Sequence, residues 1–156
     1  MAGIGRLGRF GLTYDILVYP PQLPAAISLV EGLPDQAFVV DHLAKPLIAR
    51  GVLDPWRAHM WELAAHPNVW CKVSGLVTEA HWDAWQQGDF IPYLEVVLEA
   101  FGPGRLMFGS DWPVCLLAAE YQEVLALVED FFQPLSRSEK EGVFGGNAAA
   151  FYGLTG

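Results

Sequence analysis

Residues 105–114 read RLMFGSDWPV, a short apolar run that ends at the carboxylate of Asp111 and a Trp-Pro corner. Such a run of apolar and aromatic residues predicts a strand over residues 105–110. Strands are usually closed by turn residues such as Gly, Asn or Ser. A charged residue at the end of a strand therefore suggests a functional role for Asp111.

Three further runs of the same kind precede this one. They read LTYDILVY, AFVVDHL and NVWCKVSGL and cover residues 12–19, 37–43 and 68–76. A helical pattern follows each of the four runs, and a last helix is expected near the end. The expected helices cover residues 23–33, 54–66, 91–101, 119–132 and 138–152. Because the runs are almost continuously apolar and the connections are too long for hairpins, we expect a parallel α/β sheet with both faces buried.

Several residues are of the types that begin or end helices. A three-residue apolar spacing over residues 4–10 ends at Gly11, which predicts a helix closed by a glycine cap. Asp54 is expected as the N-cap of the second helix, with Pro55 at its first position. Ser136 or Ser138 is expected to cap the last helix.

Composition narrows the class of protein. The 156 residues carry 9 Lys+Arg against 18 Asp+Glu, a net charge of -9, which argues against nucleic acid or an anionic membrane as partner. Apolar residues make up 53% and charged residues only 17%, so the chain has little polar surface, and we expect another segment or chain to cover part of it. No run approaches the roughly 18 apolar residues of a membrane-spanning helix.

Two isolated cysteines, Cys71 and Cys115, form neither a zinc knuckle nor a disulfide framework. The first eleven residues lack the apolar core of a signal peptide. Both features predict a cytoplasmic protein.

Polar residues collect where the predicted strands end. Because parallel strands present their carboxyl ends at one edge, these residues are expected to approach one another. They are Asp15 and Tyr19, Asp41 and His42, Lys72 and Ser74, and Ser110 and Asp111.

Two of these residues are the candidates for chemistry. His42 is either a hydrogen-bonded loop histidine or a group that binds a metal or transfers a proton. Asp111 is either a helix cap or Asx-turn residue, or a general base or metal ligand held by Trp112 and Pro113. Tyr19 suits a substrate hydrogen bond or an aromatic wall, and Lys72 suits an anion or solvent.

Taken in order, FVVDHLAKP, VWCKVSGL and RLMFGSDWPV closely resemble motifs of the amidohydrolase-related family, within the amidohydrolase superfamily. With GLTYDILVYPPQLP and GNAAAFYGL they are most similar to its sugar-lactone and pyrone-dicarboxylate lactonase branch. The resemblance implies a (β/α)8 barrel, for which about 250 residues are typical. The strands here match the fifth to eighth, so residues 1–156 are expected to form one partial domain, the C-terminal half. The first four strands, and the His-x-His that follows strand one in the superfamily, are absent from this sequence.

The resemblance also implies roles. His42 corresponds to the strand-six histidine near metal or substrate, and Asp111 to the strand-eight aspartate that deprotonates the attacking water. We expect a lactone substrate contacted by Tyr19, Lys72, Ser74 and Trp112. The cofactor is either one divalent metal, zinc, held by His42 and Asp111, or none. Exposed half-barrel edges are expected to favour self-association.

Three alternatives stay open at this point. A decarboxylase of the same family also ends its eighth strand in FGSD. A fragment without the His-x-His could be a non-catalytic remnant or an interaction module. An unrelated doubly wound fold would need a glycine-rich phosphate loop, and none of the four predicted strands is followed by one.

Overall fold

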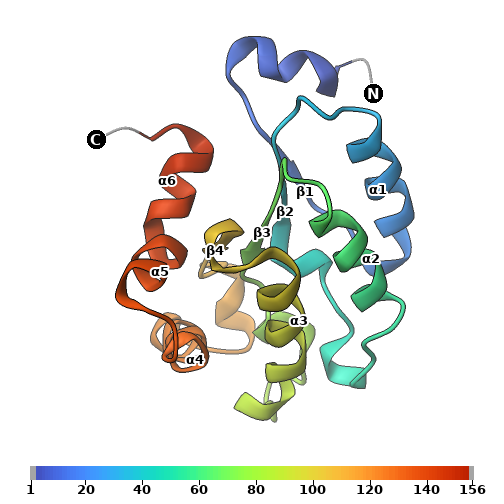
Figure 1. The fold of residues 1–156 in the computed structure, drawn as a ribbon. Helices are drawn as coiled ribbons and strands as arrows, with labels where there is room; N and C mark the ends of the chain where they lie inside the picture. Colours follow the sequence, from blue (N-terminus) through green and yellow to red (C-terminus); the bar gives the residue numbers. More distant parts are fainter. Residues whose placement is uncertain (1–2, 155–156) are drawn as a thin grey trace.

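Four parallel strands form one sheet, in the order β1-β2-β3-β4, in the computed structural model, which describes residues 3–154 (Figure 1). The strands are β1 Tyr14–Ile16, β2 Phe38–Val40, β3 Val69–Val73 and β4 Leu106–Phe108. The register pairs Ile16 with Val40, Val40 with Cys71, and Cys71 with Leu106. The predicted parallel α/β sheet is confirmed, although each strand is shorter than its apolar run.

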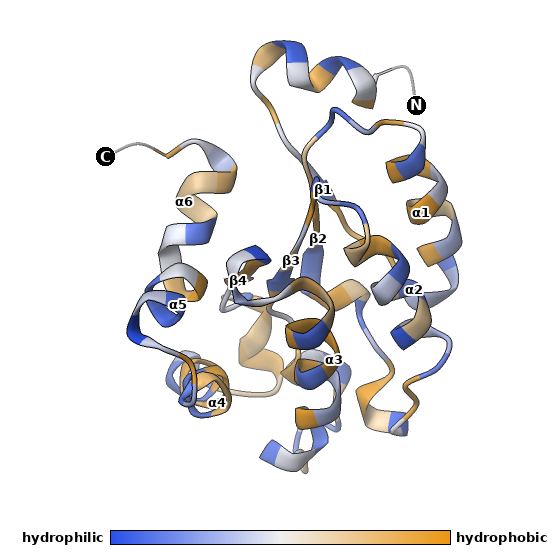
Figure 2. Cartoon of the chain, in the orientation of Figure 1, coloured by the Kyte–Doolittle hydropathy of each residue, from blue (hydrophilic) through white to orange (hydrophobic). Residues whose placement is uncertain are grey.

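Each strand is followed by a helix, as the sequence predicts. The helices are α1 Leu23–Glu31, α2 Trp56–Ala64, α3 Ile91–Phe101, α4 Tyr121–Phe132, α5 Arg137–Glu141 and α6 Asn147–Tyr152. In Figure 1, α1, α2 and α3 lie on one side of the sheet and α6 lies on the other. In Figure 2 the longer helices carry both apolar and polar segments, the pattern of helices that bury one face. No helix among residues 3–154 is long and apolar enough to cross a membrane.

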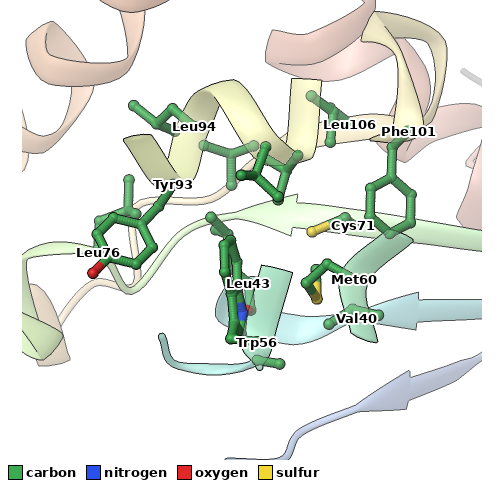
Figure 3. Close-up of a cluster of buried hydrophobic side chains, with 14 of the residues drawn as sticks. Val40, Leu43, Trp56, Met60, Cys71, Leu76, Tyr93, Leu94, Phe101 and Leu106 are labelled. Carbon is green, nitrogen blue, oxygen red and sulfur yellow. The ribbon is translucent and has the colours of Figure 1, made fainter. Parts of the chain in front are cut away.

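The main core fills the space between the sheet and helices α1 to α4, and Figure 3 shows the part of it beside α2 and α3. Val40, Cys71 and Leu106 point from neighbouring strands into this layer and are fully buried. Trp56 of α2 lies edge-on to Tyr93 of α3, with ring centroids 5.4 Å apart. These contacts fix the helices against one face of the sheet.

A smaller apolar cluster covers the opposite face. It contains Val39 of β2, Met107 of β4 and Phe151 of α6, with Trp70 and Tyr152 packed beside them. All three residues of β2 are buried, as predicted, but β3 alternates between buried and half-buried positions. The prediction of strands buried on both faces is therefore wrong for β3 and for β1, whose Asp15 is exposed, because the short helix α6 covers only part of this face.

The predicted helix ends are partly confirmed. Gly11 closes the N-terminal helical segment in a left-handed conformation, although that segment, Ile4–Phe10, is a 3-10 helix. The hydroxyl of Ser136, not Ser138, caps α5 by accepting from the Glu139 amide. Asp54 is not the N-cap of α2: Pro55 holds that position, and the Asp54 carboxylate accepts hydrogen bonds from Arg57 instead.

The last predicted helix is not continuous. A π-helical turn, Gly142–Gly146, separates α5 from α6, because Gly145 has an extended φ of 171°. The Asn147 side chain, in the first turn of α6, attaches this helix to the start of β4 by donating to the carbonyl oxygens of Pro103 and Leu106 at 2.8 and 2.7 Å. This break directs α6 across the sheet face rather than along α4.

Candidate active site

The carboxyl ends of β2 and β4 bring an imidazole and a carboxylate together. His42 Nε2 lies 3.7 Å from Asp111 Oδ1 and 3.4 Å from Asp41 Oδ2. Between 13% and 18% of each of these three side chains is exposed. Because β3 separates the two strands, only a parallel sheet with a common carboxyl edge allows this contact.

The segment that carries His42 has an unusual backbone. His42, Leu43, Ala44 and Lys45 all have positive φ, between 49° and 54°. Non-glycine residues disfavour this left-handed conformation by roughly 1–2 kcal/mol each. Burial of Leu43 and Ala44, and a 2.7 Å hydrogen bond from Trp56 Nε1 to the Leu43 carbonyl, hold the turn in place. This strained turn ends the strand and directs His42 to the shared edge.

The ring of His42 is held from the β3 side. Its Nδ1 lies 2.8 Å from the hydroxyl of Ser74, which is only 2% exposed. Gly75 follows Ser74, and a Cβ added there would lie 2.8 Å from His42 Nδ1. A Cβ added at Gly109 would lie 3.1 Å from Ser74 Cβ. Two glycines thus provide the space in which Ser74 and His42 meet.

Asp111 shares the left-handed backbone conformation, with a φ of 57°. Its main-chain carbonyl accepts a hydrogen bond from the Cys115 amide. Its side chain, by contrast, has no Lys or Arg partner within ion-pair distance among residues 3–154. The carboxylate is therefore free to accept a proton from a bound molecule.

Lys72 lies inside a group of carboxylates rather than in open solvent. Its Nζ is 2.6 Å from Asp15 Oδ2 and 3.2 Å from Asp41 Oδ1. The Tyr152 hydroxyl donates to the Asp15 carboxylate, with distances of 3.0 and 2.9 Å to its two oxygens. Burial lowers the pKa of Lys72, but the hydrogen bonds to Asp15 and Tyr152 and the charge of Asp41 outweigh it, so the net pKa is raised.

Tyr19 and Trp112 remain largely exposed, at 58% and 64%. Lys45 Nζ lies 5.8 Å from the centre of the Tyr19 ring and 2.7 Å from Glu79 Oε1. Burial lowers the pKa of Lys45, but Glu79, with smaller contributions from Tyr19 and Asp111, raises it to a net value above the ordinary one. The loops after the first three strands therefore meet in a second polar group beside His42.

The two cysteines have no place in this chemistry. Burial raises the pKa of Cys71 and of Cys115, so both stay as thiols.

The structure brings four of the residues predicted from the sequence, His42, Asp111, Ser74 and Lys72, to one edge of the sheet, but the sequence does not predict the ion pair of Lys45 with Glu79 or the contact of Tyr152 with Asp15. Lys45 looked like part of a turn, and the loop that carries Glu79 has no recognisable motif. Tyr152 lies 137 residues from Asp15, and no local pattern predicts that pairing.

A family model described as amidohydrolase matches residues 1–154. The chain belongs to the amidohydrolase family. Among its curated relatives within this family, the L-fucono-1,5-lactonase of Burkholderia multivorans is 44% identical over 162 residues, which cover 97% of this chain and 55% of the relative. The L-fucono-1,5-lactonase of Burkholderia ambifaria is 45% identical over 150 residues, covering 90% and 50%. This amidohydrolase chain thus spans about half the length of these relatives.

A solved amidohydrolase structure agrees with the fold. The crystal structure of an amidohydrolase from Burkholderia multivorans with bound zinc superposes with a TM-score of 0.95 at 44% identity, covering 99% of this chain and 57% of that one. The resemblance noted in the strand-end motifs is therefore confirmed at the level of the family.

The residues present can supply part of a zinc site. Two ligands of one tetrahedral zinc, each about 2.1 Å from the ion, lie roughly 3.4 Å apart. The 3.7 Å between His42 Nε2 and Asp111 Oδ1 is close to this spacing. Asp41 Oδ2 lies 3.4 Å from the same nitrogen, but Asp41 is paired with Lys72, and no group of three or more His, Cys, Asp or Glu side chains suited to a metal ion is found within residues 3–154. The amidohydrolase chain fits zinc as a donor of two ligands.

Proposed function

We propose that this chain forms strands five to eight of a (β/α)8 barrel that opens a sugar lactone with Asp111 as the general base. The observation that carries the proposal is the 3.7 Å approach of His42 Nε2 to Asp111 Oδ1 from two separate strand ends. The names of the curated relatives support a lactone as the substrate class. L-fucono-1,5-lactone is accordingly the first substrate to test.

The sheet edges support the half-barrel. β1 and β4 are the outer strands of a parallel sheet, and parallel strands are normally buried within larger sheets or barrels. Large apolar side chains are exposed beside both edges. They are Leu12, Leu17 and Tyr19 near β1, and Trp112, Val114, Leu116 and Leu117 after β4. Four further strands would pair both edges and cover these side chains.

The hydrolytic step follows from the different surroundings of two carboxylates. Asp41 lies 3.2 Å from the Lys72 ammonium, whereas Asp111 has no Lys or Arg within ion-pair distance among residues 3–154, and Lys45 acts on it only from farther away. Asp111 therefore accepts a proton as water attacks the lactone carbonyl, a C–O bond forms, and the carbonyl electron pair moves to oxygen. When the tetrahedral intermediate collapses, the ring C–O bond breaks and Asp111 returns the proton to the leaving alkoxide. The product is a hydroxy acid.

His42 has two chemically distinct uses, and its contact with Ser74 permits both. With the proton on Nε2, the ring donates a hydrogen bond to the developing oxyanion. With the proton on Nδ1 and donated to Ser74, the Nε2 lone pair is available to zinc, with Asp111 Oδ1 as a second ligand. When bound, zinc would polarise the carbonyl as a Lewis acid. In the metal-free chain the Nε2–H has the Asp41 and Asp111 carboxylates as acceptors, which suits the first arrangement, whereas the second arrangement would apply with zinc bound.

A complementation experiment tests the function. This chain is co-expressed with the part of the Burkholderia multivorans lactonase that it does not cover, which the resemblance assigns to strands one to four. We expect a stable complex that hydrolyses L-fucono-1,5-lactone at a rate that neither piece reaches alone. The release of acid measures this hydrolysis. Release of CO2 from a panel of carboxylic acids is measured in parallel, because it would indicate the decarboxylase alternative.

Two outcomes would contradict separate parts of the proposal. Absence of a complex, with this chain self-associating instead in size-exclusion chromatography, would contradict the half-barrel. A well-formed complex that releases no acid from any sugar lactone would contradict the lactonase.

A further inference from the structure

A continuous line of polar contacts runs from the C-terminal helix to His42. The Tyr152 hydroxyl of α6 donates to Asp15 of β1, Asp15 pairs with Lys72 of β3, and Lys72 pairs with Asp41 after β2. Asp41 Oδ2 in turn lies 3.4 Å from His42 Nε2. Figure 1 shows why α6 can contribute, since it lies on the side of the sheet opposite α1, α2 and α3.

The two oxygens of Asp41 have separate surroundings. Oδ1 is buried and accepts no hydrogen bond within the described part of the chain, so the ammonium of Lys72 at 3.2 Å is what balances its charge. Oδ2 is the oxygen that faces His42. The ammonium therefore fixes the rotation of the carboxylate and determines which oxygen meets the imidazole.

Lys72 is itself held on two sides. Asp15 Oδ2 approaches its Nζ to 2.6 Å, and the Nζ lies 5.6 Å from the centre of the Tyr152 ring, within the range of a cation–π contact. The Tyr152 hydroxyl contacts both oxygens of Asp15, which keeps that carboxylate turned toward the sheet. The ammonium is thus engaged by two carboxylates and an aromatic ring of this chain.

We propose that Lys72 and Tyr152 are positioning residues for His42, acting through Asp15 and Asp41 rather than by touching the substrate. This role rests on the proposed function, and it gives the two carboxylates beside His42 different tasks. Asp41, paired with Lys72, orients the ring, and Asp111, which has no cation at ion-pair distance among residues 3–154, accepts the proton. Without the ammonium, Asp15 and Asp41 would repel each other, and Asp41 would turn away from His42.

The first test measures the NMR signals of the His42 imidazole and does not require enzyme activity. Long-range ¹⁵N–¹H NMR spectra report the imidazole nitrogens of the four histidines in the chain, and His42→Gln assigns the relevant pair. Lys72→Met should move the His42 nitrogens while the other three histidines stay in place. Lys72→Arg should restore most of the wild-type shift, because it returns a cation to the same carboxylates.

Tyr152→Phe keeps the ring above Lys72 and removes only the hydroxyl, so it should move the His42 nitrogens in the same direction by a smaller amount. It also carries the test if Lys72→Met fails to fold. Lys140→Met and Tyr121→Phe are the matched controls, because among residues 3–154 neither side chain forms a hydrogen bond or ion pair with Asp15, Asp41 or Lys72. A His42 spectrum that changes no more in the two test variants than in the controls would overturn the proposal.

The second test uses the complemented enzyme. Loss of a residue that orients a reacting side chain typically lowers activity about 10- to 100-fold. Lys72→Met should lower kcat by such a factor with little change in KM, because the substrate contacts remain. A raised KM with normal kcat would assign Lys72 to substrate binding instead and would contradict the positioning role. The NMR result stands by itself if the complemented enzyme proves inactive, so the two failures can be told apart.

Discussion

Gly75 lies directly against the imidazole of His42, so closely that an added Cβ would sit 2.8 Å from its Nδ1 and 2.9 Å from its Cγ. The chain also contains a matched position. Gly51 has nearly the same left-handed φ, 60° against 61°, but an added Cβ there would meet no atom within 4 Å.

Gly75→Ala should therefore cost more than Gly51→Ala. Both variants suffer the left-handed strain, roughly 1–2 kcal/mol, and Gly75→Ala adds about 1–3 kcal/mol of overpacking against His42. Urea unfolding of both variants measures the difference in free energy of unfolding. Equal losses at the two positions would show that His42 is not confined by Gly75.

Ser74→Ala removes the hydrogen bond to His42 Nδ1. We expect the free energy of unfolding to fall by about 1 kcal/mol and turnover in the complemented enzyme to fall about 10- to 100-fold. Ser28→Ala is the control, because that exposed hydroxyl donates only to the Pro24 carbonyl within α1. Unchanged turnover after Ser74→Ala would mean that the ring is oriented without the hydroxyl.

Asp111→Asn removes the proposed general base while it preserves the shape of the side chain. Turnover in the complemented enzyme should fall about 100- to 10,000-fold, and the lactone should still bind in calorimetry. Asp83→Asn, in an exposed loop, is expected to behave like the wild type. Near-normal turnover of Asp111→Asn would exclude this residue as the base.

The ion pair between Lys45 and Glu79 should give stability that depends on pH. Because the folded-state pKa of Lys45 is raised above its ordinary value of 10.5, the pair contributes fully below about pH 10 and loses its effect as the pH rises through the folded pKa. Lys45→Met should therefore lower the Tm at pH 8, and the gap to the wild type should close at strongly alkaline pH. A gap that is constant with pH would indicate lost packing alone.

Zinc should stabilise this chain if His42 and Asp111 both ligate it. At a free concentration of 100 times its dissociation constant, a ligand specific for the folded state adds about 2.7 kcal/mol. We expect zinc to raise the Tm of the wild type and of His81→Gln, whose imidazole lies on an exposed loop. His42→Gln should abolish the shift, and an equal shift in that variant would place the zinc elsewhere.

Features that depend on neighbouring residues could be predicted from sequence. The alternation of apolar runs and helical patterns predicted the parallel sheet. Gly11 was predicted as a cap, and the cap of α5, Ser136, is one of the two serines predicted for it, because a cap depends on the few residues beside it. The strand ends were predicted too late in the chain. After Val40 four non-glycine residues adopt positive φ, which their own preferences oppose and which only tertiary burial sustains.

Hydrophobic periodicity and strand-end polarity are local patterns, so the amino-acid sequence was enough to predict the class of fold and to propose His42 and Asp111 as the residues for the chemistry. The groups that surround these two residues follow from the folded arrangement alone. Lys72 meets Asp15 across 57 residues and Tyr152 meets it across 137, and such pairings depend on the register of the sheet and the path of α6. Which of two adjacent carboxylates carries a neutralising cation is a property of that three-dimensional arrangement, and it distinguishes Asp111 from Asp41.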